Sequence, residues 1–145
     1  MFANLNTSRF ILCTLILTIF TFIYQWFVHG NLLANEYSAI ADLWRNPEEV
    51  DAMFGAAVFF NVALSAVLTL LYSKNHEGLG VDEGVRFGVC VGLLVGILSA
   101  MAYMWLPITT TLSTLWFVDG LVFSLLAGII LSLTYANNVG RPKKK

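Results

Sequence analysis

The segment GVDEGVRFGVCVGLLVG, residues 80–96, decides the fold because glycine recurs every four residues inside a long apolar run. In water, a glycine in the middle of a helix costs about 1 kcal/mol relative to alanine. In a lipid bilayer, the burial of apolar surface does not draw helices together, and glycine instead lets a neighbouring backbone approach closely. The segment therefore predicts a membrane helix with a packed glycine face, made of Gly84, Gly88, Gly92 and Gly96.

Three further apolar runs accompany this one. The chain of 145 residues is 58% hydrophobic and 12% charged, which is too much apolar side chain for one small soluble core. Each run reaches the length of about 18–20 residues that crosses the hydrocarbon layer, and none alternates as a barrel strand would. We predict an all-α integral membrane protein, an up-down-up-down four-helix transmembrane bundle. It forms a single transmembrane domain over residues 1–145, with spans at about 10–29, 50–72, 85–106 and 112–135.

The last run carries small residues at the same four-residue steps, at Gly120, Ser124 and Gly128. A short link joins it to the glycine-containing span, so the two helices are expected to be antiparallel neighbours. We predict that these small-residue faces pack against each other.

Basic residues are distributed unevenly over the loops of this arrangement. Only Arg45 falls on the side that holds the acidic first loop. By the positive-inside rule, the side richer in Lys and Arg faces the cytoplasm. We therefore predict cytoplasmic termini, with the tail at 137–145 as a basic anchor on the lipid bilayer and no nucleic-acid partner. The basic residues on this side are Arg9, Lys74, Arg86, Arg141, Lys143, Lys144 and Lys145.

The connection between the first two spans has a helical pattern of its own. Leu33, Tyr37 and Trp44 fall at helical spacing, with charged residues between them. We predict a short amphipathic helix at about 32–45 on the outer face of the membrane, with Tyr37, Trp44 and Arg45 as interfacial anchors. An ion pair between Arg45 and the nearby carboxylates is an alternative.

The second span is introduced by NPEE, residues 46–49. Asn46 is a preferred N-cap, Pro47 suits the first helical position, and the side chain of Glu49 can reach back to the cap. The sequence therefore predicts a helix that begins at Pro47 and runs into the span.

Polar side chains within the spans fall at a common depth. At about 1.5 Å per residue, Gln25, Asn61 and Asp119 lie roughly 7–14 Å below the outer boundary, with His29 at its edge. An acidic residue there costs roughly 3 kcal/mol, so it should face the bundle and find a partner. Asp119 is therefore either a proton- or cation-binding carboxylate or a polar residue that fixes helix register.

His29 and Asp119 could also bind a metal ion together with a methionine sulfur. The spacing does not favour this alternative, because no two candidate ligands share one helix at i, i+3 or i+4. We expect no metal site and no cofactor.

Two stretches, HGNLLANEYSAIADLWRNPEE at 29–49 and EGVRFGVCVGLLVG at 83–96, resemble an uncharacterised family of small bacterial four-span integral membrane proteins. In that family a His-Gly, a Tyr, a Leu-Trp-Arg and glycines around an arginine recur in this order. The resemblance implies the four-span fold and a bacterial inner (plasma) membrane. It implies no activity.

No Ser/His/Asp set, Cys/His pair or phosphate loop is present, so we do not expect an enzyme. Small-residue stripes outnumber ionisable groups, which favours a structural or accessory membrane protein that packs with itself or with a larger membrane complex. The alternative is a small transport or sensing module. It would bind a proton, metal ion or small solute in the outer polar layer around Asp119, Asn61, Gln25 and His29.

Overall fold

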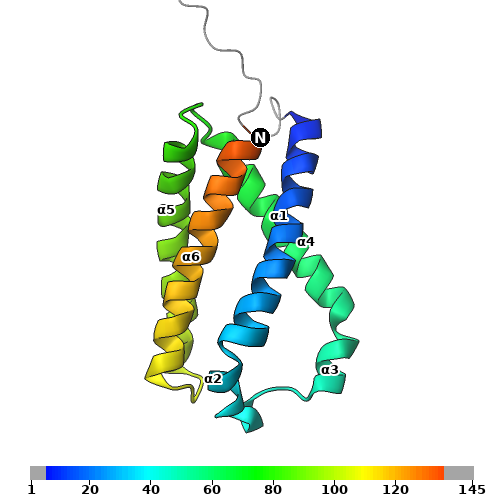
Figure 1. Cartoon of the computed structure of the whole chain (residues 1–145), viewed down its shortest axis with the longest axis vertical. Coiled ribbons are helices and arrows are strands. Elements are labelled where there is room, and N and C mark those ends of the chain that lie inside the picture. Colours follow the sequence, from blue (N-terminus) through cyan, green and yellow to red (C-terminus); the bar gives the residue numbers. More distant parts are fainter. Residues whose placement is uncertain (1–5, 136–145) are drawn as a thin grey trace, which may run out of the picture.

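The structure is a computed structural model that describes residues 6–135, and over those residues it is helical without strands. The predicted all-α fold class is confirmed, because 4 helices are long and apolar enough to cross a membrane (Figure 1). They are α1 (Thr7–Phe27) with the π turn η1 (Val28–Leu32), α4 (Phe54–Lys74), α5 (Val81–Ala100) with the 3-10 turn η3 (Met101–Met104), and α6 (Thr110–Tyr135). The tail predicted at 137–145 lies outside the described residues.

Successive long helices run in opposite directions. Figure 1 shows the start of α1 and the end of α6 at one end of the bundle, called here the terminal end, whereas α2 and α3 lie at the distal end. The chain turns from α4 to α5 at the terminal end through Gly78 and Gly80, whose φ angles of 80° and 70° favour glycine. Pro107 lies in the short distal link between η3 and α6. The order is therefore up, down, up, down.

The helices α5 and α6 form the closest pair in the bundle. A Cβ atom added at Gly88 would lie 2.6 Å from Leu125 Cα and 2.7 Å from Ser124 O. One added at Gly120 would lie 2.8 Å from Gly96 Cα. These distances leave room for hydrogen only, so the two backbones meet directly along the glycine face, as suits helix association in lipid.

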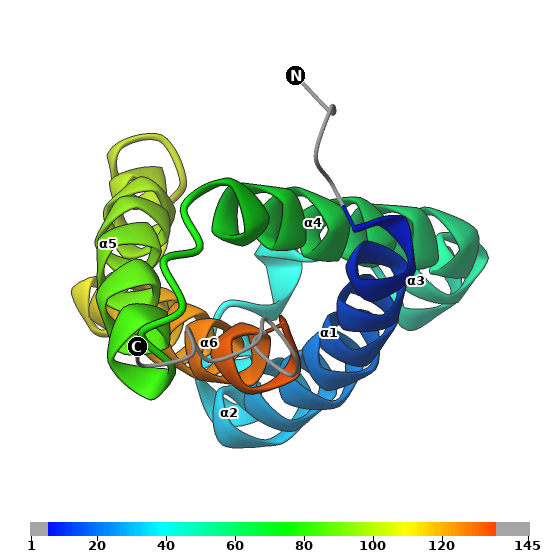
Figure 2. The same ribbon diagram turned by 90° about the horizontal axis from the view of Figure 1, so that it is seen from above.

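The helix α4 crosses the bundle obliquely, so that its first half and α3 lie away from α5 and α6 (Figures 1 and 2). Its main neighbour is α1. All of its buried residues lie in its second half, from Ser65 to Tyr72, whereas Phe54, Phe59 and Phe60 are exposed. The bundle is therefore tight at the terminal end and opens on the α4 side towards the distal end.

The core lies between α1, α4 and α6. Its buried members include Leu17, Tyr72, Phe123 and Leu131. At the terminal end, Arg9 Nη1 donates a 2.9 Å hydrogen bond to a carbonyl in the last turn of α6, that of Tyr135. A cation on the carbonyl end of a helix is electrostatically favourable, so this contact ties the start of α1 to the end of α6.

The segment predicted as one interfacial helix at about 32–45 contains a helix, but a shorter one. It is α2 (Ala34–Ser38), followed by the 3-10 turn η2 (Ala41–Leu43). Ile40 lies between them with φ −131° and ψ 41°, outside the helical region. After the break, the second half of the segment lies beside the first turns of α6, because the Trp44 ring packs 6.3 Å from the Trp116 ring, measured between centroids.

The predicted N-cap at Asn46 is confirmed. The helix α3 (Pro47–Ala52) begins at the predicted proline, and Asn46 Oδ1 accepts a 2.9 Å hydrogen bond from Glu49 N. Glu49 Oε1 accepts at 3.0 Å from Asn46 Nδ2, so it returns to the cap side chain rather than to the cap backbone. The helix does not run unbroken into the span, because Met53 adopts φ −91° and ψ 6° and α4 begins only after it.

Candidate functional site

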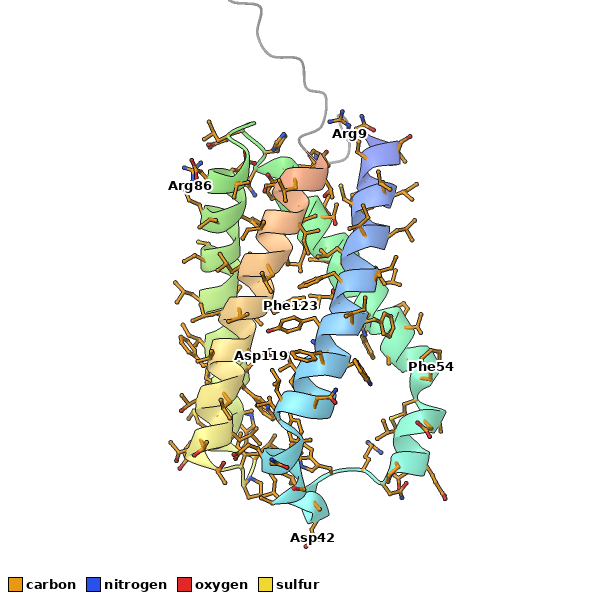
Figure 3. The ribbon with its side chains drawn as sticks, in the orientation of Figure 1. Arg9, Asp42, Phe54, Arg86, Asp119 and Phe123 are labelled. Atoms are coloured by element: carbon orange, nitrogen blue, oxygen red, sulfur yellow. The ribbon has the colours of Figure 1, made fainter. Side chains whose placement is uncertain are left out.

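Asp119 lies in α6, nine residues after the helix begins at Thr110. At 1.5 Å per residue this is about 14 Å from the distal end of the helix, so the carboxylate sits within the apolar span. Its side chain is 15% exposed. Figure 3 shows Asp119 and Phe123 on the part of α6 that faces α1. A carboxylate at this depth must find polar partners or take up a proton.

Tyr24 of α1 makes the shortest contact with this carboxylate. Its hydroxyl donates to Asp119 Oδ1 at 2.7 Å and lies 3.3 Å from the Asp119 carbonyl oxygen. The Tyr24 ring packs on Phe20 and Phe123, with ring centroids 5.5 and 5.3 Å away. Phe123 lies one helical turn after Asp119. The aromatic contacts between α1 and α6 therefore hold the hydroxyl on the carboxylate.

His29 approaches the second carboxylate oxygen from the end of α1. It lies in the π turn η1, which a 2.8 Å hydrogen bond from Leu33 N to Val28 O closes. Such turns take side chains out of the α-helical register and are frequent at functional sites. His29 Nε2 lies 3.5 Å from Asp119 Oδ2. This distance is too long for a strong hydrogen bond, so Oδ2 retains capacity for a further partner.

Tyr37 links His29 to Trp116. Trp116 Nε1 can only donate, and it donates to Tyr37 Oη at 2.9 Å. The Tyr37 hydroxyl is then free to donate to His29 Nδ1, 2.5 Å away. A neutral His29 therefore carries its hydrogen on Nε2, towards Asp119. Burial raises the pKa of Tyr37, the hydrogen bond from Trp116 lowers it, and the charge of Asp119 raises it, so Tyr37 remains a donor at neutral pH.

The three residues predicted as interfacial anchors separate into two groups. Tyr37 and Trp44 belong to the site, because the Trp44 ring lies 5.2 Å from the Tyr37 ring and 6.3 Å from the Trp116 ring, measured between centroids. Arg45 is exposed, and its Nη1 lies 3.5 Å from Glu49 Oε2. That ion pair was the alternative that the sequence left open, and at the surface it adds little stability.

A cavity of about 170 Å³ lies beside Asp119, inside the bundle, with lining residues from all four long helices. Gln25, His29, Ser99 and Trp116 supply its other polar groups, and aliphatic residues and Phe123 complete its wall. The structure thus brings together three of the four residues predicted for the polar site, namely Asp119, His29 and Gln25. The cavity is large enough for water or a small ion.

Asn61, the fourth predicted site residue, is not part of this cluster. Its Nδ2 donates to Ala57 O of its own helix at 2.8 Å, and it does not line the cavity beside Asp119. The physical reason is the oblique path of α4, whose first half, which contains Asn61, leads away from α6 (Figures 1 and 2).

A second polar cluster, which the sequence did not predict, closes the loop between α4 and α5. His76 Nδ1 lies 2.9 Å from Glu83 Oε1, and Leu79 N donates to Glu83 Oε2 at 3.0 Å. The His76 and Glu83 side chains are only 11% and 6% exposed, and the Tyr72 and Tyr135 rings lie 5.6 and 5.3 Å from the His76 ring. Glu83 of this pair accepts a hydrogen bond from the backbone N–H of Leu79, just before α5 begins. This contact caps the helix and is a structural role.

Among residues 6–135, no three His, Cys, Asp or Glu side chains gather closely enough to hold a metal ion. His29 and Asp119 form a pair without a third such group. The polar groups of this site are therefore the Asp119 carboxylate, the His29 imidazole, the Gln25 amide, the Ser99 hydroxyl and the Trp116 indole around the cavity, with the Tyr24 and Tyr37 hydroxyls bonded to Asp119 and His29.

The sequence missed Tyr24 and Trp116 as partners of the site. For Trp116 a signal exists, because it lies three residues before Asp119 and therefore on the same helix face. For Tyr24 no local signal exists, since its contact joins residues 95 positions apart in the chain.

No family model, curated protein or solved structure matches this chain. The resemblance to small bacterial four-span membrane proteins therefore stays a prediction. The part of it seen in the structure is the set of 4 long apolar helices of an integral membrane protein.

Proposed function

We propose that this chain is a small integral membrane module that binds a proton or small cation at Asp119 for transport or sensing. One observation carries the proposal: Asp119 borders a polar cavity, and among residues 6–135 its Oδ1 is held by Tyr24 at 2.7 Å whereas the sole partner of Oδ2 is His29 at 3.5 Å. A carboxylate that served only to fix helix register would be expected to use both oxygens on fixed donors. The free capacity of Oδ2 is what a cation or proton requires.

His29 would carry protons between the distal solution and Asp119. Its side chain is 32% exposed and lies at the distal end of the first span, where it would meet the aqueous phase as well as the carboxylate. Imidazole exchanges protons readily near neutral pH. The contact with Tyr37 orients the ring so that Nε2 faces Asp119, which supports this role.

Proton and cation uptake into liposomes tests the proposal. The purified chain is reconstituted with a trapped pH-sensitive dye, a potassium diffusion potential is applied, and proton entry and radioactive sodium uptake are measured. We expect flux of one of these ions above empty liposomes and its loss in Asp119→Asn. Asp42→Asn removes an exposed carboxylate at the distal end and is the matched control, which should retain the flux. Reconstituted amounts and thermal stability are compared for every variant.

The proposal fails if Asp119→Asn keeps every flux and binding property of the wild type and only lowers stability. In that case Asp119 is a structural residue of the α1–α6 contact.

A second candidate function is that of an accessory protein that packs with itself or with a larger membrane complex. The first half of α4 favours it, because within the described residues 6–135 Asn61 bonds to its own helix alone and the neighbouring Phe59 and Phe60 are exposed. A polar amide within a span commonly bonds to another helix. Native purification in mild detergent, followed by mass measurement, tests this. A chain that is always monomeric and alone would remove the candidate.

We also propose that the terminal end faces the cytoplasm of a bacterial inner membrane. Arg9 and Arg86 lie at that end and Asp42 at the other (Figure 3), a distribution that supports the positive-inside orientation. A reporter fused after Lys145 should be active only in the cytoplasm. Activity only outside the cytoplasm would reverse the orientation.

A further inference from the structure

An apolar groove runs beside Asp119, between α1, α2 and α6. Its volume of about 630 Å³ lies within the roughly 300–1,000 Å³ of small-molecule sites. Phe27, Val118 and Val122 line it and are exposed on the side of the bundle, so the groove opens laterally to lipid. Of the residues that line it, only Tyr24, Asn35, Glu36 and Asp119 are polar. The groove therefore suits an apolar molecule that carries one polar group.

The charged groups of the groove are of one sign. Asp119 and Glu36 contribute carboxyl groups, and among residues 6–135 no Lys or Arg lines the groove. The Tyr24 hydroxyl is already committed to Asp119 at 2.7 Å, so it offers little to an anionic ligand. A cleft with carboxylates and low-dielectric walls attracts a cation and disfavours an anion.

The depth of Asp119 in the membrane distinguishes between a phospholipid amine and an amine without a phosphate as the occupant of the groove. Asp119 lies about 14 Å from the distal end of α6. A phospholipid amine that reached it would draw the attached phosphate into the hydrocarbon layer, where no basic side chain of the groove would compensate that charge. The occupant therefore carries an amine without a phosphate.

We propose that this groove binds a lipophilic amine, with its ammonium group on Asp119 and its apolar body against Val118, Val122 and Leu126. The inference rests on the proposed function, since it uses the same carboxylate, that of Asp119, and it names the class of ligand. The ligand enters sideways from the distal leaflet, because the groove faces lipid on that side of the bundle. Glu36 of α2 lines the distal part of the groove and would attract the ammonium group as it enters.

Calorimetric titration of the full chain in phosphatidylcholine nanodiscs tests the inference, with empty nanodiscs subtracted. The probes are dodecylamine, which is cationic at about pH 7, dodecanol and dodecanoate. We expect saturable binding of one dodecylamine per chain, with binding of the alcohol and the acid about tenfold or more weaker. Asp119→Asn should bind the amine no better than the alcohol.

Filling the groove provides an independent variant. Val122→Trp should lose amine binding, whereas Val89→Trp, on the lipid-facing side of α5 and similarly exposed at 45% against 42%, should keep it. Equal binding of amine and alcohol by the wild type overturns the inference. If the wild type shows no preference for the amine but still shows Asp119-dependent ion flux, the proposed function stands and only the amine inference is wrong. If the preference and the flux are both absent, the inference and the proposed function are both wrong. Displacement of dodecylamine by phosphatidylethanolamine in the discs would identify a lipid headgroup and also overturn the inference.

Discussion

Replacement of Gly88 by alanine is expected to destabilise the bundle, because the added methyl group has no space between α5 and α6. Its Cβ would lie 2.6 Å from Leu125 Cα and 2.7 Å from Ser124 O. Both are backbone atoms, so no change of rotamer can move them away. The two helices must separate instead.

The size of the effect follows from these distances. Ordinary contacts to a Cβ lie at 3.4–4 Å, so the helices must move apart by about 1 Å near residue 88. A separation of that size forfeits roughly half of each atomic contact, which is worth about 0.1–0.2 kcal/mol. We take on the order of 30 such atom pairs near residue 88, which is fewer than the contacts of one buried leucine side chain. The total loss is then about 2 kcal/mol. This value lies in the range of about 1–3 kcal/mol typical of overpacked cores.

The free energy of unfolding can be measured by titrating the protein in mild detergent with dodecyl sulfate and following helix content by circular dichroism. Gly55→Ala is the matched control, because Gly55 lies in α4 and, among residues 6–135, nothing beyond its own stretch of helix lies within 4 Å of an added Cβ. Both variants exchange a helical glycine for alanine, so both share the gain in helix propensity. The difference between them reports the packing of α5 on α6.

We expect Gly88→Ala to unfold at a clearly lower dodecyl sulfate fraction than Gly55→Ala, and Gly88→Val at a lower fraction still. Equal unfolding of the two alanine variants would refute the reasoning. It would mean that α5 and α6 do not meet at backbone contact.

Two hydrogen-bonding predictions use the same unfolding assay. Tyr24→Phe removes the donor that lies 2.7 Å from Asp119 Oδ1, and we expect a loss of about 1.5–3 kcal/mol, the value of a hydrogen bond to a charged group. Glu83→Gln removes the charge that faces His76 at 2.9 Å but keeps an oxygen for Leu79 N. We again expect a loss of about 1.5–3 kcal/mol, together with faster hydrogen exchange in the loop before α5.

Each of these changes has a control on the same kind of residue. Tyr103→Phe removes the hydroxyl of a tyrosine that is 50% exposed and whose hydrogen bond to Thr110 is long, at 3.5 Å. Asp82→Asn neutralises the exposed neighbour of Glu83. A site variant that unfolds like its control would contradict the importance of the contact in question.

The sequence alone was sufficient for the class of fold. Four long apolar runs and the N-cap at Asn46 are local properties, and they appear in the structure as 4 long helices and as the start of α3. Hydropathy decides which segments enter lipid and capping chemistry decides where a helix begins, and both act within a few neighbouring residues. The same local rules also indicated that Asp119 lies deep within its span.

The local sequence pattern was insufficient to predict the break in the helix expected at 32–45. Tyr37 and Trp44 have the spacing of an amphipathic helix at a membrane surface. In the structure their rings lie in the cluster with Trp116 instead. The competing interaction comes from α6, which is distant in the sequence, so periodicity within the segment could not reveal it.

The sequence by itself thus determined that the chain is an all-helical membrane protein and at what depth its polar residues lie along the spans. Only the tertiary structure decided which of those residues meet. Depth follows from counting along one helix at about 1.5 Å per residue, whereas contact depends on the tilt and rotation of each helix. The first half of α4, which contains Asn61, leads away from α6 (Figure 2), and the π turn at the end of α1 brings His29 to Asp119. Both features arise from packing between helices, which no single segment encodes.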